Sequence, residues 1–389
     1  MSIGLYCNWK LKQNSNGDIY LNSIHAKYLF AFKNKYKKVT LLSNISSEVI
    51  TDADQLISDQ DISFILLPAF SGYLGAIKFF PRILSGIKKL TSLVNCVYIR
   101  TPEPFSWAFS LFRNKKNINY HFISNPLDVI LKKKSRKKYI TYLAFLPEYY
   151  ITCFAAYINN CSCNGPSVLN NVPFFLRNKL RVLIENTLSR DELEKKSYNK
   201  SNFTQPYKMV CVSRLQEAKG LPELICAFAH FSRRNKIHAE LSIVGDGPLK
   251  NTLQELIIKI GAQDYIHLLG HVKNGSPLDD VYKRHQILIN PSLSETGPRV
   301  ILEAMSEGLV CVSTDVGYVR HVFDKNRQMS ELIICGKDNF ETSLEKILLK
   351  LIYEDGYYEC MSLNSFNLAK RYSLDDFIEG VFCLGADNG

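Results

Sequence analysis

The chain reads QILINPSLSETGPRVILEAMSEG from Gln286 to Gly308, and this stretch decides the fold class. Its apolar start, up to Asn290, is typical of a buried parallel strand. The pair Gly297–Pro298 predicts a turn with proline where a helix can begin. From Arg299 to Glu307 apolar residues recur at helical spacing, and a glycine then supplies a stop signal. The stretch therefore predicts a strand–loop–helix unit of an α/β fold.

Two glutamates lie in this unit. We expect Glu295 in the loop and Glu303 about one and a half turns inside the helix. Two carboxylates and several unpaired backbone N–H groups would then converge at the carboxyl end of a strand. That arrangement suits a ligand with a phosphate for the helix N-terminus and hydroxyls for the carboxylates, such as a sugar nucleotide.

Short apolar runs alternate with helical patterns along the rest of the 389 residues, which indicates parallel sheets. The length favours two domains, with a linker in the polar segment Tyr198–Tyr207. We expect Rossmann-like domains over 1–200 and 201–365, facing each other across a cleft, and a helix over 366–389 that crosses back to the first domain. The predicted strands are Ile3–Cys7, Lys38–Ser43, Ile62–Leu67, Asn95–Ile99, Arg181–Ile184, Lys208–Val212, Glu240–Val244, Ile266–Leu269, Ile287–Asn290 and Val310–Ser313.

Two further segments allow specific predictions. A helix should span Tyr20–Phe32, capped from the polar loop Asn14–Asp18. The longest apolar stretch, Tyr139–Ile158, is interrupted by Pro147 and Glu148, so we expect paired helix or strand segments rather than a membrane span.

The composition indicates a cytoplasmic protein. The eleven cysteines are scattered, and the one tight pair, Cys161 and Cys163, is too close for zinc spacing. Reduced, buried thiols of a cytosolic protein are therefore expected, without a bound metal. The start, Met1 to Trp9, has the pattern of a first strand and not of a signal peptide.

Charge is distributed unevenly. Residues 1–200 carry 28 Lys and Arg against 13 Asp and Glu, whereas the remainder is slightly acidic, within a net charge of +11. The surplus concentrates in Lys33–Lys38 and Lys132–Lys138. These are either two solvated loops or a surface for the anionic inner leaflet of the cell membrane. No nucleic-acid-binding motif accompanies the charge, so we expect no nucleic acid partner.

Two weaker motifs follow other strands. Arg214 and Lys219 lie on one loop after a strand, where a guanidinium fork and a mobile ammonium could both face an anion. An ordinary basic loop would look the same. The turn from Gly245 to Pro248 would let backbone approach a ligand, although a simple strand-to-helix turn also explains it.

Together, these motifs in this order closely resemble the retaining family 4 glycosyltransferases, also called glycosyl transferases group 1. The resemblance covers roughly residues 208–322, and the spacing of Glu295 and Glu303 is its most specific part. It implies an α/β chain with the GT-B fold. It also implies that a sugar is transferred, with retention of anomeric configuration, from a nucleotide-diphosphate donor.

The resemblance assigns roles by position. Arg214 and Lys219 would hold the donor diphosphate and neutralise the leaving nucleotide, and Glu295 would contact the transferred sugar. Glu303 would accept hydrogen bonds from the ribose. The backbone from Gly297 to Val300 would approach the sugar and distal phosphate, and Arg299 is either a surface residue or a further phosphate ligand. Protein cations would then replace a metal ion in stabilising the leaving group.

The first domain departs from the family pattern. Where many members have a two-glycine loop, this chain has only Asn16 and Gly17. Where many have a histidine after a later strand, it has Arg100 and Glu103, and either residue or neither replaces that histidine. His121 is more typical of a core or strand histidine. The acceptor-side candidates are therefore Asn16, Gly17, Arg100 and Glu103.

We therefore expect a glycosyltransferase that uses a UDP- or GDP-linked sugar and a carbohydrate or lipid-linked acceptor in bacterial surface polysaccharide synthesis, with no cofactor besides the donor. The alternatives are a GT-B epimerase or phosphorylase and a degenerate sugar-nucleotide-binding subunit. Product analysis without an acceptor separates the first two from a transferase, and binding without turnover identifies the last.

Overall fold

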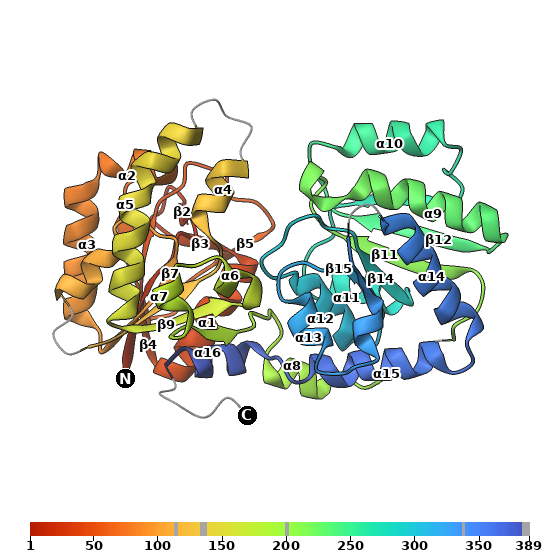
Figure 1. The fold of residues 1–389 in the computed structure, drawn as a ribbon. Helices are drawn as coiled ribbons and strands as arrows, with labels where there is room; N and C mark the ends of the chain where they lie inside the picture. Colours follow the sequence, from red (N-terminus) through yellow and green to blue (C-terminus); the bar gives the residue numbers. More distant parts are fainter. Residues whose placement is uncertain (113–115, 133–137, 199–201, 337–338, 383–389) are drawn as a thin grey trace. The chain divides into compact units, whose positions relative to one another are not determined.

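The computed structural model describes residues 1–112, 116–132, 138–198, 202–336 and 339–382 (Figure 1). The chain divides into two compact units: unit 1 comprises Met1–Leu183 and Leu374–Gly389, and unit 2 comprises Ile184–Ser373. The first boundary lies before the polar segment Tyr198–Tyr207, and residues 199–201 of that segment are outside the described residues.

Unit 1 contains a seven-stranded parallel sheet in the order β10-β9-β8-β7-β1-β4-β6. The chain leaves β1 toward one edge and returns at β7 to build the other, so the strand order reverses between β1 and β7. The strands are β1 (Ser2–Tyr6), β4 (Lys38–Asn44), β6 (Ile62–Leu67), β7 (Cys96–Thr101), β8 (Asn117–Phe122), β9 (Asn160–Asn164) and β10 (Arg181–Leu183). A separate antiparallel sheet joins β2 (Lys12–Gln13), β3 (Ile19–Asn22) and β5 (Asp54–Leu56).

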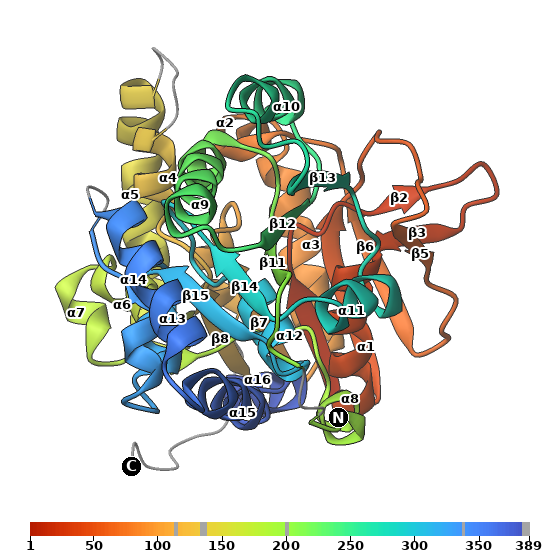
Figure 2. The ribbon, with the colours of Figure 1, turned by 90° about the vertical axis from the view of Figure 1, so that its right-hand side faces the viewer.

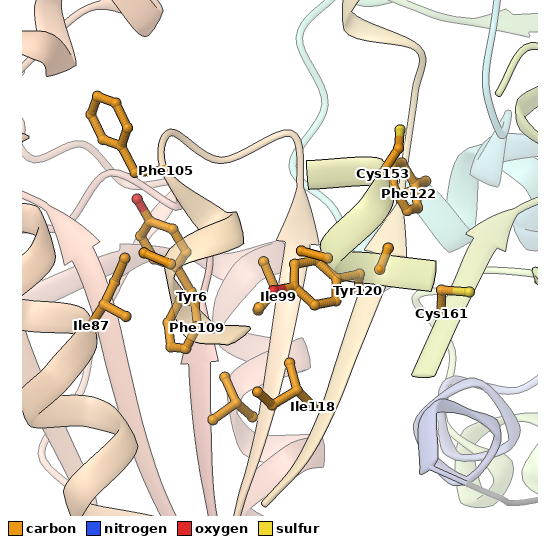
Figure 3. Close-up of a cluster of buried hydrophobic side chains, with 14 of the residues drawn as sticks. Tyr6, Ile87, Ile99, Phe105, Phe109, Ile118, Tyr120, Phe122, Cys153 and Cys161 are labelled. Atoms are coloured by element: carbon orange, nitrogen blue, oxygen red, sulfur yellow. The ribbon is translucent and has the colours of Figure 1, made fainter. Parts of the chain in front are cut away.

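Successive side chains of these strands enter two different cores, as the period of a strand requires. Figure 3 shows part of the core on one face, from Ile87 and Tyr6 to Phe122 and Cys161. The helical segments on this side are α2 (Gly72–Ile77), α3 (Phe80–Leu93), the 3₁₀ segment η1 (Ser106–Phe112), α4 (Pro126–Lys132), α5 (Lys138–Tyr157), α6 (Pro166–Asn170) and α7 (Phe174–Arg177).

The second core lies on the other face of the sheet, under α1 (Ser23–Tyr36) and α16 (Leu374–Phe382). Phe377 packs its ring against Tyr28, Tyr98 and His121. The carbonyl of Val381 accepts hydrogen bonds from Asn119 and Arg181. The end of the described chain is thus an integral part of unit 1.

Unit 2 contains a six-stranded parallel sheet in the order β13-β12-β11-β14-β15-β16, which reverses between β11 and β14 (Figure 2). The strands are β11 (Tyr207–Val212), β12 (Ala239–Val244), β13 (Ile266–Gly270), β14 (Ile287–Asn290), β15 (Val310–Thr314) and β16 (Ile333–Ile334). The helices are α8 (Arg190–Lys195), α9 (Leu221–Asn235), α10 (Lys250–Lys259), α11 (Ser276–Lys283), α12 (Arg299–Ser306), α13 (Val319–Phe323), α14 (Phe340–Tyr353) and α15 (Tyr357–Ala369), with 3₁₀ turns η2 (Glu217–Lys219) and η3 (Met329–Leu332).

The predicted α/β class with two Rossmann-like domains is confirmed, and every predicted strand is present. Two element predictions were wrong. The first helix begins at Ser23 and not Tyr20, because Ile19–Asn22 pairs as β3 and the side chain of Asn22 caps the helix by accepting from Ile24 N. The stretch expected to form paired segments is the single helix α5, which continues through Pro147.

Candidate functional site

The candidate site of unit 2 lies where its strand order reverses. In open parallel sheets, ligands bind outside the carboxyl ends of the strands at this point. Here the two loops concerned are 213–220, after β11, and 291–298, after β14. The first loop carries Arg214 and Lys219, and the second carries Glu295 and Gly297. The topology thus brings together loops that are separate in the sequence.

Lys219 and Glu295 form an ion pair across these loops, through Nζ and Oε1. Both side chains are about one-fifth exposed, which leaves them accessible while reducing solvent screening. Ser292 Oγ donates to the same Oε1 at 3.1 Å. Among the described residues no hydrogen bond reaches Glu295 Oε2, so this oxygen can accept from a ligand hydroxyl.

Backbone contacts hold the two loops in place. Leu293 N donates to the carbonyl of Ala218 at 2.9 Å, next to Lys219. Leu215 N donates to the carbonyl of Asp246 at 3.0 Å, which fixes the loop after β11 on the turn after β12. In that turn Gly245 has φ +140°, and a Cβ there would lie 1.9 Å from the carbonyl oxygen of Ser213. Only glycine fits this approach.

The loop after β15 supports the other side of the site. A Cβ on Gly317, at φ +60°, would lie 2.8 Å from the carbonyl of Thr296 and 3.1 Å from Gly297 N. Thr314 Oγ1 donates to the carbonyl of Ser292 at 2.6 Å. A contact between two loops leaves no local pattern, so the sequence alone does not predict this role of Gly317.

Glu303 lies inside α12, as expected, and is half-buried. Its Oε1 accepts from Thr187 Oγ1 at 2.5 Å, and its Oε2 accepts from Tyr282 OH at 3.4 Å. Each carboxylate oxygen has lone pairs for a second donor, so Glu303 is oriented but still able to bind hydroxyls. Burial, followed by the charge of Glu303, raises the pKa of Tyr282 well above its usual value.

The other predicted residues of unit 2 lie around this pair. Arg214 is exposed on the same loop as Lys219, and no ion pair of the described residues engages it. Gly297 precedes α12, while Arg299 and Val300 are its first two residues and are half-buried. The structure therefore collects these residues on neighbouring loops, and Lys219 pairs directly with Glu295.

A cavity of about 250 Å³ adjoins the site. Pro291, Ser292 and Leu293 line one side of it, and residues 314–316, after β15, line another. The starts of α9 and α14 close it with Glu223 and Phe340. Ser292 belongs both to this cavity and to the hydrogen bonds of Glu295, so a ligand at the ion pair has room beside it.

In unit 1, the acceptor-side candidates Arg100 and Glu103 lie at the corresponding reversal between β1 and β7. Asn8 N, just after β1, donates to Glu103 Oε1 at 2.6 Å. Burial raises the pKa of Glu103 to about 8, although its bond with Asn8 N and the charge of Arg100 act in the opposite direction. Arg100 is in β7, in register with His121.

A second buried carboxyl, which the sequence did not reveal, lies nearby on α5. Glu148 accepts from Phe105 N at 2.6 Å and from Trp107 Nε1 at 2.7 Å. Burial raises its pKa to about 7. Both glutamates thus bind backbone of the loops after β1 and β7.

Asn16 and Gly17 are elsewhere in unit 1. They form the exposed turn between β2 and β3, where Asn14 Oδ1 accepts from Asn16 N and Asp18 N at 3.0 and 2.9 Å. The structure therefore places two of the four acceptor-side candidates at β7 and the loop after it, and the other two in the turn of a different sheet. His121 is fully buried, with Nδ1 2.9 Å from Ser162 Oγ, as expected of a core histidine.

The structure describes the side chains of the first basic cluster, Lys33–Lys38, and of Lys138 in the second. Lys33, in α1, forms an ion pair of 3.0 Å with Asp59, and Lys35 Nζ lies over the ring of Tyr36. The side chains of Lys132–Lys137 are outside the described residues. In the part of the chain that the structure describes, no helix is long and apolar enough to cross a bilayer, and no group of three potential metal ligands gathers.

Comparison with known proteins supports the resemblance to glycosyltransferases. Residues 194–351 match the family of glycosyl transferases group 1, which confirms the resemblance inferred from the motifs. One relative is the GtfA subunit of the UDP-N-acetylglucosamine–peptide N-acetylglucosaminyltransferase of Streptococcus pneumoniae serotype 4. It is 25% identical over 182 residues, covering 46% of this chain and 35% of the relative. The chain covers about a third of the length of the curated relatives that it matches.

Solved structures agree in fold over nearly the whole chain. Sucrose-phosphate synthase of Thermosynechococcus elongatus superposes with a TM-score of 0.68 at 12% identity, covering 98% of this chain and 97% of that chain. Anabaena HepE in complex with UDP gives 0.65 at 13% identity, with 98% of each chain covered. The predicted GT-B fold is therefore confirmed.

Proposed function

We propose that this chain, which has the GT-B fold and matches the family of glycosyl transferases group 1 over residues 194–351, is a glycosyltransferase. It would move a sugar from a UDP- or GDP-linked donor to a glycan or lipid-linked acceptor, with retention of configuration and without a metal. Bacterial surface polysaccharide synthesis is the setting we propose. The Lys219–Glu295 pair at the strand reversal of unit 2 carries the proposal.

The chemistry of transfer explains why this pair matters. Breaking the anomeric C–O bond builds negative charge on the diphosphate and positive charge on the sugar. Lys219 and Arg214, on the loop after β11, would stabilise the leaving diphosphate more strongly in the transition state than in the ground state. Glu295 and the backbone near Gly297 would hold the sugar, because both lie in the loop that leads into α12, whose first N–H groups have no partner within the helix.

Binding of the donor would also rearrange the ion pair between Lys219 and Glu295. The ammonium of Lys219 is paired with the carboxylate of Glu295. A donor diphosphate would compete for that ammonium, so that Glu295 turns to the sugar hydroxyls. Glu303, oriented by Thr187 and Tyr282, would accept from the ribose. Residues that are already positioned would thus contact the diphosphate, the sugar and the ribose of the donor.

The test uses Glu295→Gln and Lys219→Ala. Each should lower turnover of a nucleotide sugar by about two orders of magnitude, as the loss of a transition-state contact does. The nucleotide and the released or transferred sugar are measured against a panel of UDP- and GDP-sugars, after calorimetric binding has identified the donor. Retention is read from the anomeric configuration of the product.

The matched control is the exposed ion pair of Lys350 with Glu331, elsewhere in unit 2. Glu331→Gln and Lys350→Ala should leave turnover unchanged. If all four variants turn over like the parent chain, the site assignment is wrong. Donor binding without turnover across acceptors would instead identify a binding subunit, and rearranged sugar without acceptor an epimerase.

A further inference from the structure

The helix α5 of unit 1 has two contrasting faces. Its inner face is buried in the core of the sheet through Phe145, Tyr149 and Cys153. Its outer face is exposed and carries large apolar side chains along the whole helix. Figure 1 shows the course of α5 in unit 1. The exposed apolar residues are Tyr139, Ile140, Leu143, Tyr150, Ile151, Phe154, Tyr157 and the adjoining Ile158.

The short helix α7 continues this surface. Phe174 is 78% exposed, and Phe175 makes an edge contact with Tyr157, at 5.9 Å between ring centroids. We call the exposed residues of α5 together with Phe174 and Phe175 the apolar face. At 1.5 Å per residue, the 20 residues of α5 give it a length of roughly 30 Å. An exposed apolar surface of this extent indicates an interaction site.

Basic side chains lie at both ends of the apolar face. Lys138 Nζ lies over the ring of Tyr139 at 5.2 Å, and Lys179 Nζ lies over the ring of Tyr157 at 5.1 Å. These bases are near opposite ends of α5. Arg177 is exposed at the end of α7. The sequence adds further bases in 132–137, whose side chains are outside the described residues.

Within residues 129–184 these bases are accompanied by no exposed acid. Glu148 is the single acidic residue of that segment, and it is buried, with its carboxylate bonded to Phe105 N and Trp107 Nε1. The segment that forms the apolar face therefore contributes bases and no exposed acid to the surface. A second copy of this chain would bring like charges together, which disfavours self-association through this surface.

Tyrosine and phenylalanine flanked by lysine and arginine are suited to the interface of a lipid bilayer. Basic side chains beside the inserted residues are attracted by anionic headgroups. We propose that the apolar face of α5 and α7 docks unit 1 on a bilayer that contains anionic lipids, with α5 lying in the plane of the interface. This docking is independent of donor chemistry, so its test requires no turnover.

The experiment measures binding of the full chain to vesicles of phosphatidylcholine mixed with phosphatidylglycerol and to vesicles of phosphatidylcholine alone. The chain should bind the mixed vesicles, and the double variant Leu143→Ser/Ile151→Ser should bind them at least about tenfold more weakly, because apolar burial is lost. Raising NaCl from about 0.1 M to about 1 M shortens the Debye length from about 10 Å to about 3 Å and should also weaken binding.

The matched control is Ile258→Ser/Leu363→Ser, which removes an exposed isoleucine and an exposed leucine from α10 and α15 of unit 2. It should bind vesicles like the parent chain, and thermal unfolding should show that both double variants are folded. Equal binding of the two double variants would overturn the proposal. The proposal would also be wrong if the parent chain did not bind the mixed vesicles. It would be wrong as well if the parent chain formed a dimer that the double variant Leu143→Ser/Ile151→Ser dissociates.

Discussion

Glu103 and Glu148 hold the loops of unit 1 through buried carboxyl groups. With a pKa of about 8, Glu103 keeps its proton near neutral pH, while its Oε1 still accepts from Asn8 N. The folded chain binds this proton more tightly than the unfolded chain, where the value is about 4.5. The contribution of Glu103 to stability is therefore complete below about pH 4.5 and is lost as pH rises through about 8.

The variant Glu103→Gln removes this titration and keeps an oxygen for Asn8 N. Relative to the parent chain, its melting temperature should rise between about pH 5 and pH 8. Circular dichroism melts at several pH values check this. Glu48→Gln is the control in the same unit, since its hydrogen bond with Lys10 lowers the pKa of Glu48. A constant difference between Glu103→Gln and the parent would contradict the prediction.

At the residue scale, the sequence predicted the members of the site that follow one another in a motif. Lys219 and Glu295 have residue types and positions after strands that suit a phosphate and a sugar. Thr187 and Tyr282, which hold Glu303, are 116 and 21 residues away from it and belong to no motif. Such partners are set by how separate elements pack, so a local pattern does not contain them.

At the scale of elements, strands were more predictable than their surroundings. Each buried parallel strand is a short apolar run, whereas β8 and β9 contain Asn119, His121 and Ser162, which are polar. Their side chains are satisfied within the core, as in the bond of Ser162 Oγ to Asn119 Oδ1 at 3.0 Å. Hydrophobic patterning therefore does not predict these two strands.

Helix α5 shows a related limit. Proline removes one hydrogen bond and strains the preceding turn, which favours a break in the helix. Here Phe145 and Tyr149, on either side of Pro147, are both buried in the same core. Packing of the inner face maintains one helix, and the exposed proline faces outward.

Helix α16 should be essential to the stability of unit 1. Phe377→Ala removes a buried ring from contact with Tyr28, Tyr98 and His121, which should cost about 3–5 kcal/mol. Hydrogen exchange should show protection lost in β1, β4 and β7 and retained in β11 and β14. The control Leu363→Ala changes an exposed leucine of α15 and should leave both units protected. Equal loss in both units would contradict this assignment.

At the scale of the whole molecule, the two units divide charge and chemistry between them. Residues 1–200 carry the positive surplus and the apolar face, whereas the family match falls at 194–351. A nucleotide should therefore bind to unit 2 and stabilise that unit alone. At about one hundred times its Kd, UDP should stabilise that unit by about 2.7 kcal/mol.

Hydrogen exchange with and without UDP checks this expectation. Protection should increase in the loops after β11, β12 and β14, and unit 1 should keep its exchange rates. Lys219→Ala is the matched variant in which the increase should be much smaller. Protection that appears first in the β2–β3 turn would place the nucleotide at Asn16 and Gly17 instead.

The return of α16 to unit 1 also has a consequence during translation. Unit 1 is encoded in two pieces, with about 190 residues between them, so at about 5–20 residues per second its last helix emerges roughly 10 to 40 seconds after β10. Throughout this interval Tyr98 and His121 lack the cover of Phe377, while unit 2 is synthesised in full. The part of the sheet face that Phe377 covers therefore remains exposed until synthesis reaches α16.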